Sequence, residues 1–104
     1  MRKITKQIAE ALANGNNKTV GNTSVKEGKV YLHGNLIVDW RENGLHMSLA
    51  DWNTPTTRER LNGIAEYLGL KVRFSQKNYY PYLNGELINS NDWINIRELH
   101  KQGL

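Results

Sequence analysis

Few residues of this chain have the type and spacing that catalysis requires. The histidines His33, His46 and His100 lack the i, i+4 spacing of a metal site, and no cysteine is present to complete one. Glu27-Gly28-Lys29 matches half of a nuclease signature, but no aspartate precedes it, and a hairpin turn explains the triplet better. No serine lies in a nucleophile elbow, and no glycine-rich phosphate loop precedes a helix. We therefore expect a protein that is not an enzyme, with no catalytic residue, metal or cofactor.

Residues suited to binding gather in the segment from residue 73 to residue 87, where cationic side chains alternate with aromatic rings. Because proline cannot donate to a strand ladder, Pro81 predicts an edge strand or a bulge, which would leave some of the large rings on the surface. The candidate binding residues are Arg73, Lys77, Tyr79, Tyr80 and Tyr82.

Two kinds of partner suit these residue types. Tyrosine and arginine are enriched among the residues that dominate protein interfaces, whereas cations beside aromatic rings can neutralise phosphates and stack on unpaired bases. The order of helix, strands and helix is loosely similar to double-stranded-RNA-binding domains, but Thr56 to Arg60 mixes charges where those domains carry a lysine cluster. We favour a protein partner, with nucleic acid as the alternative.

Composition indicates one globular domain spanning residues 1–104, since 38% of the residues are hydrophobic and 23% are charged. The absence of cysteine excludes a disulfide framework. No continuous apolar run follows Arg2, Lys3 and Lys6, so neither a signal peptide nor a membrane span is expected. The formal net charge of +4 suits nucleic acid, but solubility alone explains it as well.

The clearest element is a helix in the segment from Trp52 to Leu70. Thr56 and Glu59 have the spacing of a capping box, and Gly69 is suited to the C-terminal end. One apolar stripe follows, formed by Leu61, Ile64, Ala65 and Leu68. Gly63 interrupts this helix at a cost of about 1 kcal/mol relative to alanine, so we expect a close approach to a strand, Trp40 or Trp52.

The remaining segments predict an α+β fold with an N-terminal helix, an antiparallel meander of three or four strands, the central helix packed on the sheet and a C-terminal β-hairpin. Asn43-Gly44 and Asn84-Gly85 predict hairpin turns, and Gly34-Asn35 is either a turn or a bulge. A short strand is expected at residues 93–96, and the tail 97–104 is helical or frayed. The tryptophans Trp40, Trp52 and Trp93 are expected in the core.

Three motifs together resemble a pattern found in small accessory proteins of tailed bacteriophages. They are Gly21-Asn22-Thr23, Leu32-His33-Gly34-Asn35, and Trp52-Asn53-Thr54 running into Thr56 to Gly63, and the resemblance covers about residues 5–96. It implies an accessory protein that works in the cytoplasm of an infected bacterium. By analogy with small phage accessory proteins that occupy a surface of another protein, we expect a host or viral protein as the partner, and the composition predicts no membrane association. The resemblance implies no functional residue.

Overall fold

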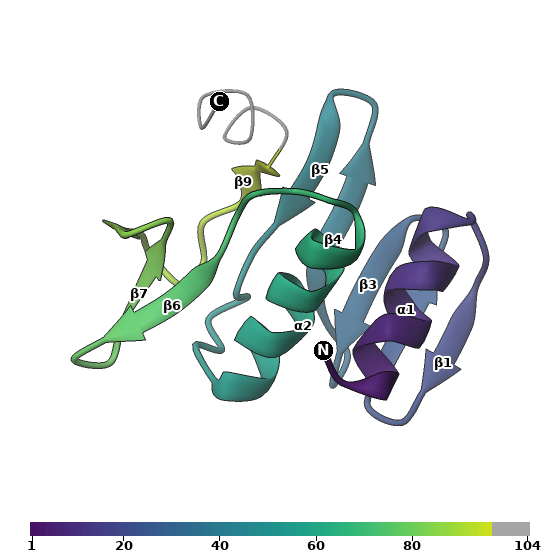
Figure 1. The fold of residues 1–104 in the computed structure, drawn as a ribbon, viewed down its shortest axis with the longest axis horizontal. Helices are drawn as coiled ribbons and strands as arrows, with labels where there is room; N and C mark the ends of the chain where they lie inside the picture. Colours follow the sequence, from purple (N-terminus) through teal and green to yellow (C-terminus); the bar gives the residue numbers. More distant parts are fainter. Residues whose placement is uncertain (97–104) are drawn as a thin grey trace.

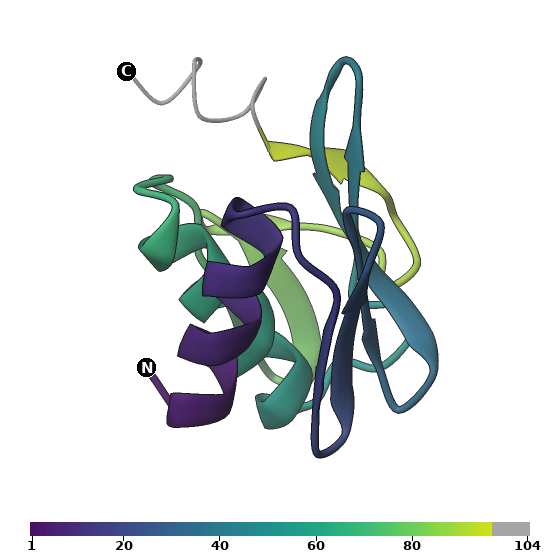
Figure 2. The ribbon, with the colours of Figure 1, turned by 90° about the vertical axis from the view of Figure 1, so that its right-hand side faces the viewer.

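The structure, a computed structural model, describes residues 1–96 of the chain. In this part of the chain, one layer is a six-stranded sheet, and two helices and a three-stranded sheet lie on one face of it (Figures 1 and 2). The predicted α+β class is therefore confirmed. The expectation for the tail 97–104 lies outside the described residues.

The larger sheet is an antiparallel meander of five consecutive strands, with a short sixth strand added at its edge. The expected meander had three or four strands, and the observed one has five, because residues 18–26 form two strands joined at Gly21-Asn22. The predicted short strand near the C-terminus is confirmed, since it pairs with the fifth strand. The six strands are β1 (Lys18–Val20), β2 (Thr23–Lys26), β3 (Lys29–Leu32), β4 (Asn35–Arg41), β5 (Gly44–Met47) and β9 (Ile94–Asn95).

Four hairpins among residues 1–96 have two-residue turns in which both residues have positive φ, the pattern of a type I′ turn. The predicted turn at Asn84-Gly85 is confirmed, and Gly34 belongs to a tight turn rather than a bulge. The hairpin near Asn43 is also present, but its loop is Glu42-Asn43, because Gly44 already pairs with Arg41. The four turns are Glu27-Gly28, His33-Gly34, Asn78-Tyr79 and Asn84-Gly85.

Helix α1 (Lys3–Ala13) and helix α2 (Pro55–Tyr67) both turn apolar side chains toward the larger sheet. The predicted capping box is wrong. The cap is Thr54, whose hydroxyl accepts the Thr57 N–H at 3.2 Å, because Pro55 lacks an N–H and suits the first helical position. The predicted end is confirmed: Gly69 has φ of 73° and Leu70 N–H donates to the Ala65 carbonyl at 2.8 Å.

The close approach at Gly63 is to α1, not to a strand or a tryptophan. A Cβ atom placed on Gly63 would clash with Thr5 Cγ2 and lie 3.1 Å from Met1 Cγ. Glycine is therefore needed here because the two helices touch.

Arg60 is the polar centre of this contact, and only 1% of it is exposed. Its Nε donates to Thr23 Oγ1 at 3.0 Å, and its Nη1 donates to Thr5 Oγ1 at 3.1 Å and forms an ion pair with Glu59. Nη2 donates to Asn22 Oδ1 at 3.3 Å. A buried cation is tolerated only when it is paired and hydrogen-bonded in this way. Arg60 thus joins α2 to α1 and to β2.

The tryptophans are not core residues, contrary to expectation. Trp40 is 46% exposed, Trp52 56% and Trp93 39%. They lie near strand ends or in connections, while aliphatic side chains such as Val30, Val38 and Met47 occupy the interior. Trp93 packs against the Arg41 guanidinium, which is 5.6 Å from the ring centre.

Candidate functional site

The segment that carries the candidate residues forms the three-stranded sheet, made of β6 (Phe74–Lys77), β7 (Tyr80–Leu83) and β8 (Glu86–Leu87). Lys77 pairs with Tyr80, Ser75 with Tyr82, and Tyr82 with Leu87. Residues directly opposite each other in an antiparallel pair project to the same face. We call this set the tyrosine face: Ser75, Lys77, Tyr80, Tyr82 and Leu87.

The tyrosine face is turned to solvent, while the other face of the small sheet is packed. Tyr80 is 62% exposed and Leu87 63%, whereas Phe74, Pro81 and Leu83 are buried. The predicted edge position of Pro81 is wrong, because β7 is the middle strand. Proline is accepted there because its nitrogen faces the end of β8, where only its carbonyl is needed: Ile88 N–H donates to the Pro81 carbonyl at 3.1 Å.

The structure brings some of the predicted residues together and separates others. Lys77, Tyr80 and Tyr82 share the tyrosine face, and Tyr79 projects from the hairpin tip beside it with 89% of its surface exposed. Arg73 precedes β6 at the opposite end, four residues and roughly 13 Å from Lys77. The structure therefore groups Lys77, Tyr80 and Tyr82, with Tyr79 beside them, and places Arg73 apart from them in the lining of a hollow beside α2.

Leu87 belongs to the tyrosine face but was not predicted as a binding residue. The signal was present in the sequence, because a two-residue turn at Asn84-Gly85 places Leu83 opposite Glu86 and hence Tyr82 opposite Leu87.

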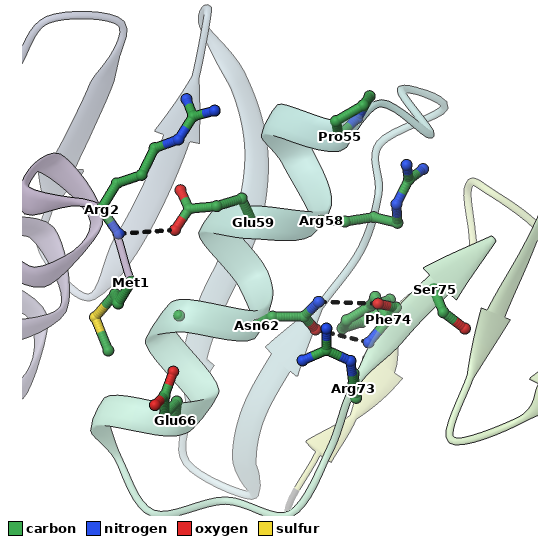
Figure 3. A pocket seen from close by; sticks show the side chains of 11 residues that line it. Met1, Arg2, Pro55, Arg58, Glu59, Asn62, Glu66, Arg73, Phe74 and Ser75 are labelled. Atoms are coloured by element: carbon green, nitrogen blue, oxygen red, sulfur yellow. Dashed lines mark hydrogen bonds between the residues drawn. The ribbon is translucent and has the colours of Figure 1, made fainter.

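Side chains from α2 hold the small sheet in place. The Asn62 amide donates to the Phe74 carbonyl at 2.9 Å and accepts from the Phe74 N–H at 2.7 Å (Figure 3). Arg58 donates to Gln76 Oε1 at 3.2 Å and to Asn53 Oδ1 at 2.5 Å, and Asn53 Nδ2 donates to the Tyr79 carbonyl at 3.3 Å. The tyrosine face is therefore presented on a fixed support.

A hollow of about 630 Å³ lies between α2 and β6 (Figure 3). Its charged lining has both signs, with Arg2, Arg58 and Arg73 against Glu59 and Glu66. Arg58 is already engaged by Asn53 and Gln76. This balance gives the hollow no clear preference for an anion or a cation.

Glu59 is the residue of this hollow whose pKa is perturbed. Burial alone raises its pKa. Hydrogen bonds from Thr5 Oγ1 at 2.5 Å and from the Arg2 N–H, together with the Arg60 guanidinium, lower the pKa by more than burial raises it. The net result is a pKa below the usual value, which favours the ionised carboxylate as the partner of Arg60.

Two findings concern the described part of the chain as a whole. No group of three histidine, aspartate or glutamate side chains within it could hold a metal ion. None of its helices is long and apolar enough to cross a membrane.

Comparison with known proteins gives one match. No curated protein and no solved structure is significantly similar to the chain. The family model described as Kyanoviridae Gp96 protein matches residues 1–100. This match confirms the coarser expectation of a small phage protein and does not test the motif set on which the resemblance rested. The chain therefore belongs to the Kyanoviridae Gp96 family of phage proteins.

Proposed function

We propose that this phage protein binds a host or viral protein through the tyrosine face and acts by occupying a surface of that partner rather than by catalysis. The observation that supports this is that two large exposed side chains adjoin Tyr82 on one face: Tyr80 lies two residues away along β7, and Leu87 lies opposite Tyr82 on β8. Contiguous exposed apolar area of this kind marks interaction sites in soluble proteins.

The arrangement of the face favours a protein partner. Its centre is aromatic and aliphatic, while Lys77 and the hydroxyl-bearing Ser75 lie at its border on β6. An apolar centre with a polar rim is the usual anatomy of a protein interface. Leu87 supports the same interpretation, because an aliphatic side chain neither neutralises a phosphate nor stacks on a base.

Single-stranded nucleic acid is the second candidate. Lys77 pairs directly with Tyr80, so a cation and an exposed ring stand side by side on the sheet. Binding of unpaired strands commonly uses such pairs, with the cation at the backbone and the ring under a base.

The test compares three immobilised proteins exposed to lysate of infected host cells: wild type, the double variant Tyr80→Ser/Leu87→Ser, and Tyr67→Ser as a control. Tyr67 is a 39% exposed tyrosine at the end of α2, away from the face. Tyr82 is left intact because it is half-buried and its loss would disturb the fold.

A true partner is retained by wild type and control, is lost with the double variant, and after purification binds the double variant more than about tenfold more weakly. If no protein distinguishes the double variant from the control, the protein-partner proposal fails. Titration of random single-stranded oligonucleotides with salt decides the second candidate: a steep loss of affinity supports nucleic acid, and no binding at low salt excludes it.

A further inference from the structure

A second hollow, separate from the tyrosine face, lies between the β3–β4 hairpin and the start of α2. Its volume is about 410 Å³, within the range of small-molecule sites. None of its lining residues is a lysine, arginine, aspartate or glutamate, in contrast to the hollow beside β6. The lining consists of Leu32, His33, Asn35, Ile37, Trp52, Thr54, Thr56 and Thr57.

The hollow combines a packed base with an exposed aromatic wall. Leu32, Ile37 and Thr57 are buried, so the side chains at its base are fixed by the core. Trp52 remains 56% exposed although it lines the hollow. The loop that carries Trp52 is held in place, because Trp52 N–H donates to the Leu49 carbonyl at 2.8 Å and Asp51 N–H donates to the Ser90 carbonyl at 2.9 Å.

The polar groups of the lining fall into two sets. The hydroxyls of Thr54 and Thr57 bond to each other at 3.0 Å and serve the start of α2. The Asn35 amide and the Thr56 hydroxyl have no hydrogen-bond partner among residues 1–96, although both groups border the hollow. His33 uses only Nε2, which is 3.4 Å from Asn22 Nδ2.

We propose that this hollow binds a neutral planar heteroaromatic ring of the nucleobase class, stacked on Trp52 and held at its edge by the Asn35 amide. Base rings stack on aromatic side chains irrespective of sequence. An asparagine amide offers one donor and one acceptor in the geometry that pairs with the N6 and N7 positions of adenine. Adenosine is therefore the first ligand to test.

The chemistry of the lining argues against other ligand classes. A bound phosphate or carboxylate would find no lysine or arginine among the lining residues. A purely aliphatic group would bury the Asn35 amide and the Thr56 hydroxyl without partners, which is costly. This inference is independent of the proposed function of the tyrosine face.

The experiment is a titration of the ¹⁵N-labelled full chain with adenosine. A final adenosine concentration of about 10 mM allows weak binding, with a dissociation constant in the millimolar range, to be detected. The signal is the indole N–H resonance of Trp52, assigned with the variant Trp52→Phe. We expect a saturable shift of that resonance, while those of Trp40 and Trp93 stay in place. Asn35→Ala should weaken adenosine binding by more than about tenfold, and Trp93→Phe serves as the control that should not.

A second arm uses a short oligodeoxyadenylate to separate the two sources of the ring. If the oligodeoxyadenylate saturates the Trp52 shift at a lower concentration than adenosine does, the site exists and its ligand is an unpaired nucleic-acid base. If only adenosine saturates the shift, the site exists and its ligand is a free nucleoside. Absence of a Trp52 shift with either ligand overturns the proposal. Equal affinity of wild type and Asn35→Ala, with both variants folded, overturns the assignment of the ring edge.

Discussion

Tyr79 occupies a backbone conformation for which tyrosine is poorly suited. In the four type I′ turns of residues 1–96, the second position has φ of 78° at Gly28, 81° at Gly34, 84° at Gly85 and 68° at Tyr79. Glycine adopts this conformation without steric cost, whereas other L-residues lose roughly 1–2 kcal/mol. We expect Tyr79→Gly to stabilise the protein.

The magnitude follows from two opposing contributions. Relief of the left-handed conformation contributes roughly 1–2 kcal/mol, and the greater freedom of glycine in the unfolded chain costs roughly 0.5–1 kcal/mol. The ring contributes little, because Tyr79 is 89% exposed. The net gain is about 0.5–1 kcal/mol, which raises the Tm of a domain of this size by roughly 2–8 °C.

Urea unfolding followed by circular dichroism measures this gain, and two further variants isolate its cause. Tyr79→Ala removes the ring but keeps a Cβ atom, so its stability should stay near that of wild type. Gly85→Ala creates the same strain in the neighbouring turn and should lose about 1 kcal/mol. Equal stability of the glycine and alanine variants at residue 79 would refute the argument from backbone conformation, and a loss in both would show that the ring packs.

Three other predictions concern α2 and its contacts. Gly63→Ala should lower the free energy of unfolding, measured in urea, by about 1–3 kcal/mol, because the new methyl group meets Thr5 Cγ2. Adding Thr5→Ser to the same chain should recover most of this loss. If Gly63→Ala loses no stability, the two helices can separate freely. Thr54→Ala should cost about 1 kcal/mol in a thermal melt and Thr56→Ala less than about 0.5 kcal/mol, whereas the reverse order would place the cap at Thr56. Because the pKa of Glu59 is lowered, the unfolded chain binds more protons than the folded one, so the contribution of Glu59 to folding stability is present above the usual glutamate pKa and is lost as pH falls through the lowered pKa. Glu59→Gln should therefore flatten the loss of stability at acid pH. Parallel curves of stability against pH for the two proteins would contradict this.

Local signals in the sequence predicted much of the fold. Asn84-Gly85 and Gly69 were predicted correctly because a residue that favours positive φ marks its position without help from distant residues. The cap at Thr54 was missed because Thr56, unlike Thr54, has a glutamate three residues later, as a capping box requires. In the structure the Glu59 carboxylate instead accepts from Thr5 and pairs with Arg60. Such competition between local and distant partners cannot be resolved from spacing alone.

The burial of individual side chains was harder to predict. Arg60 is buried by Thr5 and Thr23, which precede it by 55 and 37 residues and have no local signature. The prediction for the tryptophans failed in the opposite way, since side chains expected in the core are exposed. Hydrophobicity alone gives no information on whether a ring lies at a strand end. The exposure of Tyr79 and Tyr80 matches the expectation of surface rings, and whether they bind a partner stays a prediction.

The contact between Asn62 and Phe74 also protects the edge of a sheet. Asn84 N–H donates to the Arg73 carbonyl at 2.9 Å, so the backbone groups of Phe74, one residue further, point away from β7. Those are the groups through which another chain could add a strand. The Asn62 amide occupies both of them, at 2.9 and 2.7 Å. A helix side chain thus takes the place of a neighbouring strand and closes one route by which copies of this protein could join edge to edge into aggregates.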